Sequence, residues 1–94
     1  MHLLENPDWQ SLDSPSANDI VNLKIEDVYH YMVRVIIVKI EGDIITGKTD
    51  YIYDWNTKEP IKGSRVDSLF ENEQEFQRIH IFKIIKSNSH LASR

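Results

Sequence analysis

The hydrophobic pattern is clearest between residues 33 and 54. Six of the eight residues in 33–40 are apolar and β-branched, and such side chains favour a pleated strand. Because both faces of this segment are apolar, we expect a central strand. Gly42 follows within Glu-Gly-Asp and indicates a tight hairpin, since glycine readily adopts positive φ. The return strand is expected over residues 44–54, where Gly47 predicts the bend or bulge that lets a small sheet curl.

The segment before this hairpin predicts a short helix, over about residues 19–30. Residues 16–19 have the composition of a helix start, with Asp19 suited to the positive end of the helix. The apolar residues that follow lie at helical spacings of 4, 3 and 4, namely Val21, Ile25, Val28 and Met32. Residues 23–26 also alternate between apolar and polar as a strand does, which leaves a second interpretation open.

The rest of the chain predicts short strands separated by turns. Strands are expected over residues 65–70, 75–81 and 85–88, with loops or turns over 55–64, 71–74 and 82–84. Residues 1–18 contain turn-forming residues and predict a flexible acidic arm, which Leu3, Leu4, Trp9 and Leu12 could pin to the domain or to a partner. Residues 19–88 would form a single domain, and residues 89–94 a frayed tail. The expected fold is mainly β: a small five-stranded antiparallel barrel preceded by a short N-terminal helix.

Composition removes several classes of protein. The 94 residues include no cysteine, which excludes a disulfide scaffold, a zinc–thiolate site and a cysteine nucleophile. The longest apolar run, residues 35–38, is far shorter than the roughly 20 residues that cross a bilayer. No basic leader is present at the N-terminus, so we expect a cytoplasmic protein that does not bind a membrane.

The charge is unevenly distributed along the chain. The net charge is −4, and residues 1–27 alone contain one basic and six acidic residues. An acidic segment of this kind suits a partner with a basic surface, because complementary charge speeds encounter.

Two sequence patterns resemble known small barrels. Val33, Val35 and Ile37 lead to Gly42, and Gly47 follows five residues later, which resembles the first motif of the Sm-like (SH3-like) superfamily. Residues 79–84 keep the hydrophobic alternation of the second Sm motif but lack its Arg-Gly pair. The resemblance implies an SH3/Sm-like barrel.

Several stretches are also similar to the Rof family, acidic Sm-like barrels that inhibit the Rho termination helicase by direct contact. These stretches are residues 22–25, 41–43, 47–50 and 81–84. A cysteine that the family carries near its helix is absent here. The resemblance implies a regulator, specifically an inhibitor, of transcription.

No pattern indicates catalysis. The four histidines (His2, His30, His80 and His90) do not have the spacing of metal ligands, and there is no phosphate-binding loop or nucleophile motif. We therefore expect no enzyme, no metal site and no cofactor.

Two binding surfaces follow from the sequence. The first expectation is docking on a protein, such as a basic nucleic-acid-handling protein, through residues of the arm and helix: Glu5, Asp8, Trp9, Asp13, Asp19, Glu26 and Asp27. The alternative is a single-stranded RNA or DNA site, since aromatic rings beside basic residues stack bases and neutralise phosphates. Its residues are Tyr51, Tyr53, Trp55, Lys58, Lys62 and Arg65. A third interpretation is a structural subunit of an oligomer, and the oligomeric state is left open.

Overall fold

The computed structural model describes residues 2–26, 30–61 and 64–87 and is mainly β. Its strands are β1 (His2–Leu3), β2 (Ile20–Glu26), β3 (His30–Glu41), β4 (Ile44–Asp54), β5 (Gln74–Phe76) and β6 (Ile81–Ile85). Its helical elements are the 3-10 turns η1 (Trp9–Ser11) and η2 (Arg78–His80) and the α-helix α1 (Ser64–Glu71).

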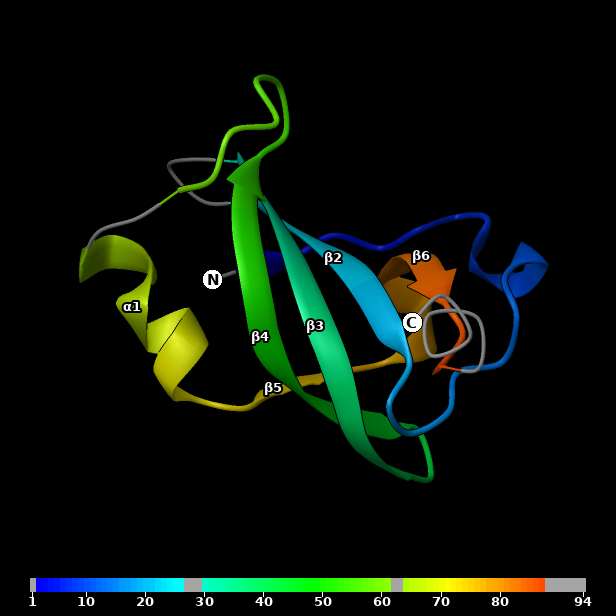
Figure 1. The fold of residues 1–94 in the computed structure, drawn as a ribbon. Coiled ribbons are helices and arrows are strands. Elements are labelled where there is room, and N and C mark those ends of the chain that lie inside the picture. The colour runs from blue at the N-terminus through cyan, green and yellow to red at the C-terminus, as the bar shows by residue number, and fades with distance from the viewer. Residues whose placement is uncertain (1, 27–29, 62–63, 88–94) are drawn as a thin grey trace.

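The strands form one curled antiparallel sheet (Figure 1). Its order is β1-β2-β3-β4-β5, and β6 pairs with β2. Because β3 occupies one edge of β2, the other edge holds β6 opposite residues 20–23 and β1 opposite residues 25–26. In the part of the chain that the structure describes, no ladder joins β5 to β6. The expectation of a closed barrel is therefore wrong: β5 has only three residues, η2 lies between it and β6, and the sheet remains a half-barrel.

The predicted N-terminal helix over residues 19–30 is also wrong, because residues 20–26 form β2. Val21, Leu23 and Ile25 are at most 2% exposed, as expected for one face of a strand. β3 and β6 flank β2 and supply hydrogen-bond partners to its backbone on both edges, which outweighs the helical spacing. Met32, which completed that spacing, belongs to β3, and residue 28 lies outside the described residues.

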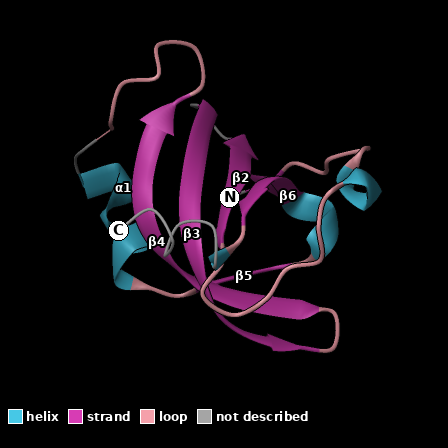
Figure 2. Ribbon diagram, turned by 45° about the vertical axis from the view of Figure 1, so that its right-hand side comes forward, coloured by secondary structure: helices cyan, strands magenta, loops and turns pink. Residues whose placement is uncertain are grey.

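The long hairpin agrees with the sequence. β4 spans the residues predicted for the return strand, and the turn uses Gly42 at φ +60°. At Gly47 a Cβ atom would lie only 2.3 Å from Cγ1 of Val35, so the two strands approach too closely for a side chain there. The β3–β4 ladder also shifts register twice, and such bulges bend the hairpin, as Figure 2 shows.

The C-terminal elements differ from the prediction. Residues 65–70 lie in α1 rather than in a strand: positions 66, 69 and 70 have helical spacing, and Leu69 is buried beside β4. The predicted strand over 75–81 is divided into β5, η2 and the start of β6. β6 begins four residues before the predicted fifth strand (85–88) and includes the predicted turn at 82–84. Among the described residues, no helix has the length and apolar character needed to cross a membrane.

The hydrophobic core lies on the inner face of the curled sheet. Its buried residues come from β2, β3, β4, β5, β6 and α1: Val21, Leu23, Ile25, Tyr31, Val33, Val35, Ile37, Ile45, Ile52, Leu69, Phe76 and Ile81. Since successive side chains in a strand point to opposite faces, filling the inner face fixes which residues the outer face presents.

Residues 2–12 lie against this core. Leu3 and Leu12 pack on it, and Asn6 is buried. The backbone N–H of Asn6 donates to the carbonyl oxygen of Ile79 at 2.7 Å, and its side-chain amide donates to that of Ile81 at 2.9 Å. These bonds fasten the arm to η2 and β6.

Candidate functional site

The outer face of the sheet carries the side chains that alternate with the core. Pairing of β2 with β3 and of β3 with β4 aligns, in the two rows described next, residues that are 8 to 29 positions apart in the chain. The two central rows are Asn22–Arg34–Tyr51 and Lys24–Met32–Tyr53. Polar, basic and aromatic side chains thus meet on one face.

An aromatic cluster surrounds the ammonium group of Lys24. Its Nζ lies 4.4 Å from the ring centroid of Phe82 in β6 and 5.3 Å from that of Trp55, which follows β4. The His30 ring is 4.9 Å from Trp55, whose Nε1–H donates to the backbone oxygen of Tyr31. These cation–π and ring contacts join β6, β2, β3 and the end of β4 into one surface.

In the neighbouring row, Asn22–Arg34–Tyr51, Arg34 holds the Tyr51 side chain in place. Its Nη2 lies 2.7 Å from Oδ2 of Asp50, and its guanidinium carbon lies 5.1 Å from the ring centroid of Tyr51. The Tyr51 and Tyr53 rings are 5.8 Å apart and inclined by 44°. Tyr51 is 36% exposed, so this ring pair is partly accessible to a ligand.

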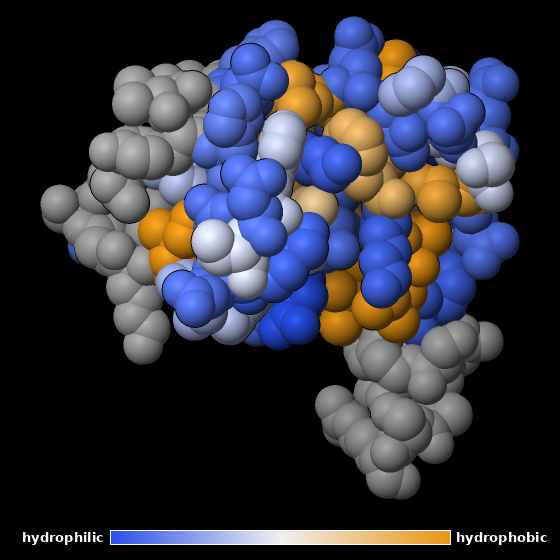
Figure 3. Space-filling view, turned by 90° about the horizontal axis from the view of Figure 1, so that it is seen from above, coloured by the Kyte–Doolittle hydropathy of each residue, from blue (hydrophilic) through white to orange (hydrophobic). Residues whose placement is uncertain are grey.

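The face is locally basic although the chain is acidic. Its basic residues are Lys24, Arg34, Lys48 and Lys83, and its acidic residues are Glu26 and Asp50. Cross-strand register places Lys48 opposite Ile36 and Lys83 opposite Asn22. In a view of the whole molecule from above, the molecular surface is mostly hydrophilic, with apolar side chains gathered in separate patches (Figure 3).

The loop after β4 is held by Asp54. Its Oδ1 accepts the backbone N–H groups of Thr57 at 3.0 Å and Asn56 at 2.7 Å, which hold the pKa of Asp54 below its usual range. An isolated bridge between Tyr53 and Pro60 closes the loop. These contacts fix the conformation of the loop directly after β4, where Trp55 lies.

The structure gathers only some of the predicted nucleic-acid-binding residues. Tyr51, Tyr53 and Trp55 share the outer face. Lys58 is exposed in the loop, Arg65 belongs to α1, and Lys62 lies outside the described residues. Sequence reasoning missed the other members of the face: Lys24, His30, Arg34, Phe82 and Lys83. The alternation in residues 23–26 is the signal for Lys24, but only strand register places it beside residues from β3, β4 and β6.

The residues predicted to bind a protein partner are presented in different ways. Glu5, Asp8 and Asp13 are exposed on the arm, and Glu26 is exposed at the end of β2. Trp9 is half-buried, with the guanidinium carbon of Arg78 5.1 Å from its ring centroid. Asp27 lies outside the described residues, and Asp19 is buried.

Asp19 fastens residues 16–19 to the chain after β6. Its Oδ2 accepts from Lys86 Nζ at 2.6 Å and from the Ser16 N–H at 2.7 Å, and its Oδ1 accepts from the Ser87 N–H at 2.7 Å. Burial by itself would raise the pKa of Asp19. The hydrogen bonds from Lys86 and the two backbone N–H groups outweigh that effect, so the pKa lies below its ordinary value. We assign Asp19 a structural role, because it is wholly buried and its carboxylate is occupied by internal donors.

The described histidines show no metal-binding arrangement. No group of three or more His, Cys, Asp or Glu residues in the described part of the chain could hold a metal ion. His80 accepts the Gln77 N–H through Nδ1 at 3.1 Å. Burial lowers the pKa of His80 and His2 lowers it further, while Glu5 opposes both effects.

Comparison with known proteins assigns no family. A scan against protein-family models finds no match, and searches of the curated proteins and of the solved structures find none either. The resemblances to Sm-like barrels and to the Rof family therefore remain predictions from the sequence.

Proposed function

We propose that the protein is a non-enzymatic binding module whose outer sheet face binds single-stranded nucleic acid. The observation that carries the proposal is the meeting of aromatic rings and basic side chains on this face, from β6, β2, β3 and β4. The small curled sheet supports the proposal, since sheets of this kind present an outer face to extended ligands.

The rings favour a single strand over a duplex. Stacking requires an accessible base face, and a duplex hides its base faces inside the helix. The Tyr51–Tyr53 pair is the part of the aromatic surface on which we expect bases to stack, because Tyr51 is open to solvent. Each stacked base contributes roughly 1–3 kcal/mol by alanine substitution.

The cations supply the attraction to phosphate. Lys48 and Lys83 are exposed and have no ion pair among the described residues, so both are available to a backbone phosphate. Arg34 already forms an ion pair with Asp50, and we expect it mainly to position the Tyr51 ring. Binding should weaken steeply with salt, because each neutralised phosphate releases counterions.

The test is fluorescence anisotropy with labelled single-stranded RNA and DNA of about ten nucleotides, titrated at about 50 mM and 200 mM salt. Tyr51→Ala should weaken binding by about 5- to 150-fold. Lys83→Gln should reduce the slope of log affinity against log salt by about 0.7. Arg78→Gln removes a positive charge away from this face. It is the matched control, and the variant should bind as the wild type does. Absence of salt-sensitive binding by the wild type, or equal losses in all three variants, contradicts the proposal.

A second candidate function is docking on a protein through the arm. The observation that favours it is that Asn6 anchors the arm, so Glu5, Asp8 and Asp13 are exposed on a fixed segment. Preorganised charge of this kind lowers the cost of binding a basic partner. The resemblance to the Rof family would make that partner the Rho helicase and the protein a transcription inhibitor.

This candidate is tested by calorimetry with purified Rho and a triple variant, Glu5→Gln with Asp8→Asn and Asp13→Asn. Neutralising these exposed residues leaves the packed part of the arm intact, which truncation of residues 1–18 would not. Wild-type binding that the triple variant loses supports docking, whereas equal binding removes the arm from the interface. Light scattering on the same samples shows whether the protein is instead an oligomer subunit.

A further inference from the structure

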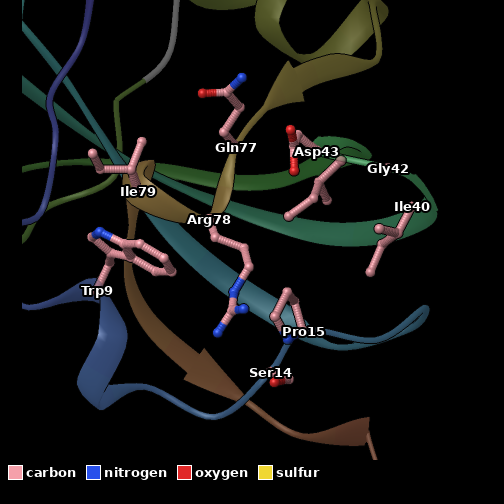
Figure 4. A pocket seen from close by; sticks show the side chains of 10 residues that line it. Trp9, Ser14, Pro15, Ile40, Gly42, Asp43, Gln77, Arg78 and Ile79 are labelled. Carbon is pink, nitrogen blue, oxygen red and sulfur yellow. The ribbon is translucent and has the colours of Figure 1, made fainter.

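A cavity of about 430 Å³ lies away from the outer face. It is formed between the arm, the tip of the β3–β4 hairpin and turn η2 (Figure 4). Its volume falls within the range of about 300–1,000 Å³ that small-molecule sites occupy. Three segments distant in sequence form its walls, so the folded chain supplies the site before any ligand arrives.

Most of the wall is apolar. Ile45 belongs to the buried core and is 1% exposed, and Trp9 and Ile79 are half-buried beside the cavity. Ile40 is 39% exposed on the hairpin. An apolar ligand that covers Ile40 and the Trp9 indole is favoured, because burial removes their apolar surface from water.

The polar side chain best placed to orient a ligand is Arg78. Its guanidinium carbon lies 5.1 Å from the Trp9 ring centroid, and it points between Trp9 and Pro15 (Figure 4). Arg78 has no ion pair among the described residues. A guanidinium held against an indole and lacking a counter-ion suits a carboxylate, which it can bind through two parallel N–H donors.

The other charged group on the cavity wall limits the charge of the ligand. Asp43 lines the cavity from the hairpin turn, and it forms no ion pair with Arg78. A second negative group on the ligand would be repelled by this carboxylate. We propose that the cavity binds a small hydrophobic monocarboxylate, with its carboxylate on Arg78 and its apolar body against Trp9 and Ile40.

The experiment is a titration of ¹⁵N-labelled protein with 2-naphthoate, followed by NMR. The two tryptophans give a built-in comparison: the indole N–H signal of Trp9 should shift saturably, and that of Trp55 should not, because Trp55 lies on the outer face. The uncharged analogue 2-naphthamide should bind about tenfold more weakly, because it forms no charged pair with Arg78.

Variants separate the two parts of the site. Arg78→Gln should bring the affinity for 2-naphthoate down to that for 2-naphthamide, and Ile40→Thr should weaken both ligands. Arg34→Gln, on the outer face, is the matched control and should change neither affinity. A shift at Trp55 instead of Trp9, no saturable shift at either, or equal affinity for acid and amide in the wild type would overturn the proposal. None of these results bears on oligonucleotide binding, since the two sites share no residue.

Discussion

Replacing Asp19 by asparagine tests whether the carboxylate fastens residues 16–19 to the chain after β6. Asparagine has nearly the same shape, so the change removes a charge rather than volume. The asparagine carbonyl oxygen can still accept a hydrogen bond from one backbone N–H group. Its NH₂ group would point at the donors that now bond to the other carboxylate oxygen, and two donor groups form no hydrogen bond. Lys86 would lose its counter-ion.

The expected cost follows from burial. Removing one partner of a fully buried ion pair costs about 3–5 kcal/mol. Asp19 is wholly buried, but the Lys86 side chain is 28% exposed and can be partly rehydrated, which lowers the cost to about 2–3 kcal/mol. A domain of this length has a total stability of roughly 5–14 kcal/mol. In a domain of this size, a loss of about 2–3 kcal/mol should lower the melting temperature by roughly 10–20 °C.

Urea denaturation followed by tryptophan fluorescence measures this loss, and its pH dependence identifies the charge. Because the native pKa of Asp19 is lowered, its stabilisation is fully present above the unfolded-state pKa of about 3.9. It is lost as the pH falls through the lower native pKa. The free-energy difference between wild type and Asp19→Asn should therefore be constant near neutral pH and shrink in acid.

Asp13→Asn is the matched control, since it removes an exposed carboxylate from the same segment and should change stability by less than about 0.5 kcal/mol. The reasoning is refuted if Asp19→Asn is as harmless as this control at neutral pH. A difference that persists undiminished in strong acid would show that packing, not charge, explains the loss.

Two further changes test the hairpin and the turn. Gly47→Ala should destabilise the protein by about 1–3 kcal/mol in the same denaturation assay, because the new Cβ would lie 2.3 Å from Val35 Cγ1 and 2.8 Å from the Ile36 carbonyl oxygen; a neutral effect would mean that β3 and β4 separate easily there. Burial lowers the pKa of His80, so the unfolded chain takes up more protons and the native state loses stability as the pH falls through about 6.5. His80→Gln should reduce that loss when the urea midpoint is compared on either side of this pH, and an unchanged slope would assign the loss to other groups.

Part of the fold can be predicted from the sequence because its signals are local. The β-branched run, the turn at Gly42 and the return strand depend on neighbouring residues, and the structure confirms them. Residues 20–26 satisfy both a helical and a strand period, and the decision comes from β3 and β6, which pair with both edges. Helix α1 was missed for a related reason: a segment of eight residues is too short for its period to be distinctive.

The candidate face shows the same division. Tyr51, Tyr53 and Trp55 are close in sequence, so their aromatic cluster can be predicted from the chain alone. Lys24 and Phe82 join them only through the register of four strands, and a shift by one residue would turn them into the core. Likewise, the sequence shows that the N-terminal quarter is acidic, but only the fold shows which of its carboxylates are exposed and that Asp19 is buried. Composition and periodicity belong to the chain, whereas burial and register belong to pairs of segments, and these pairs exist only once the chain has folded.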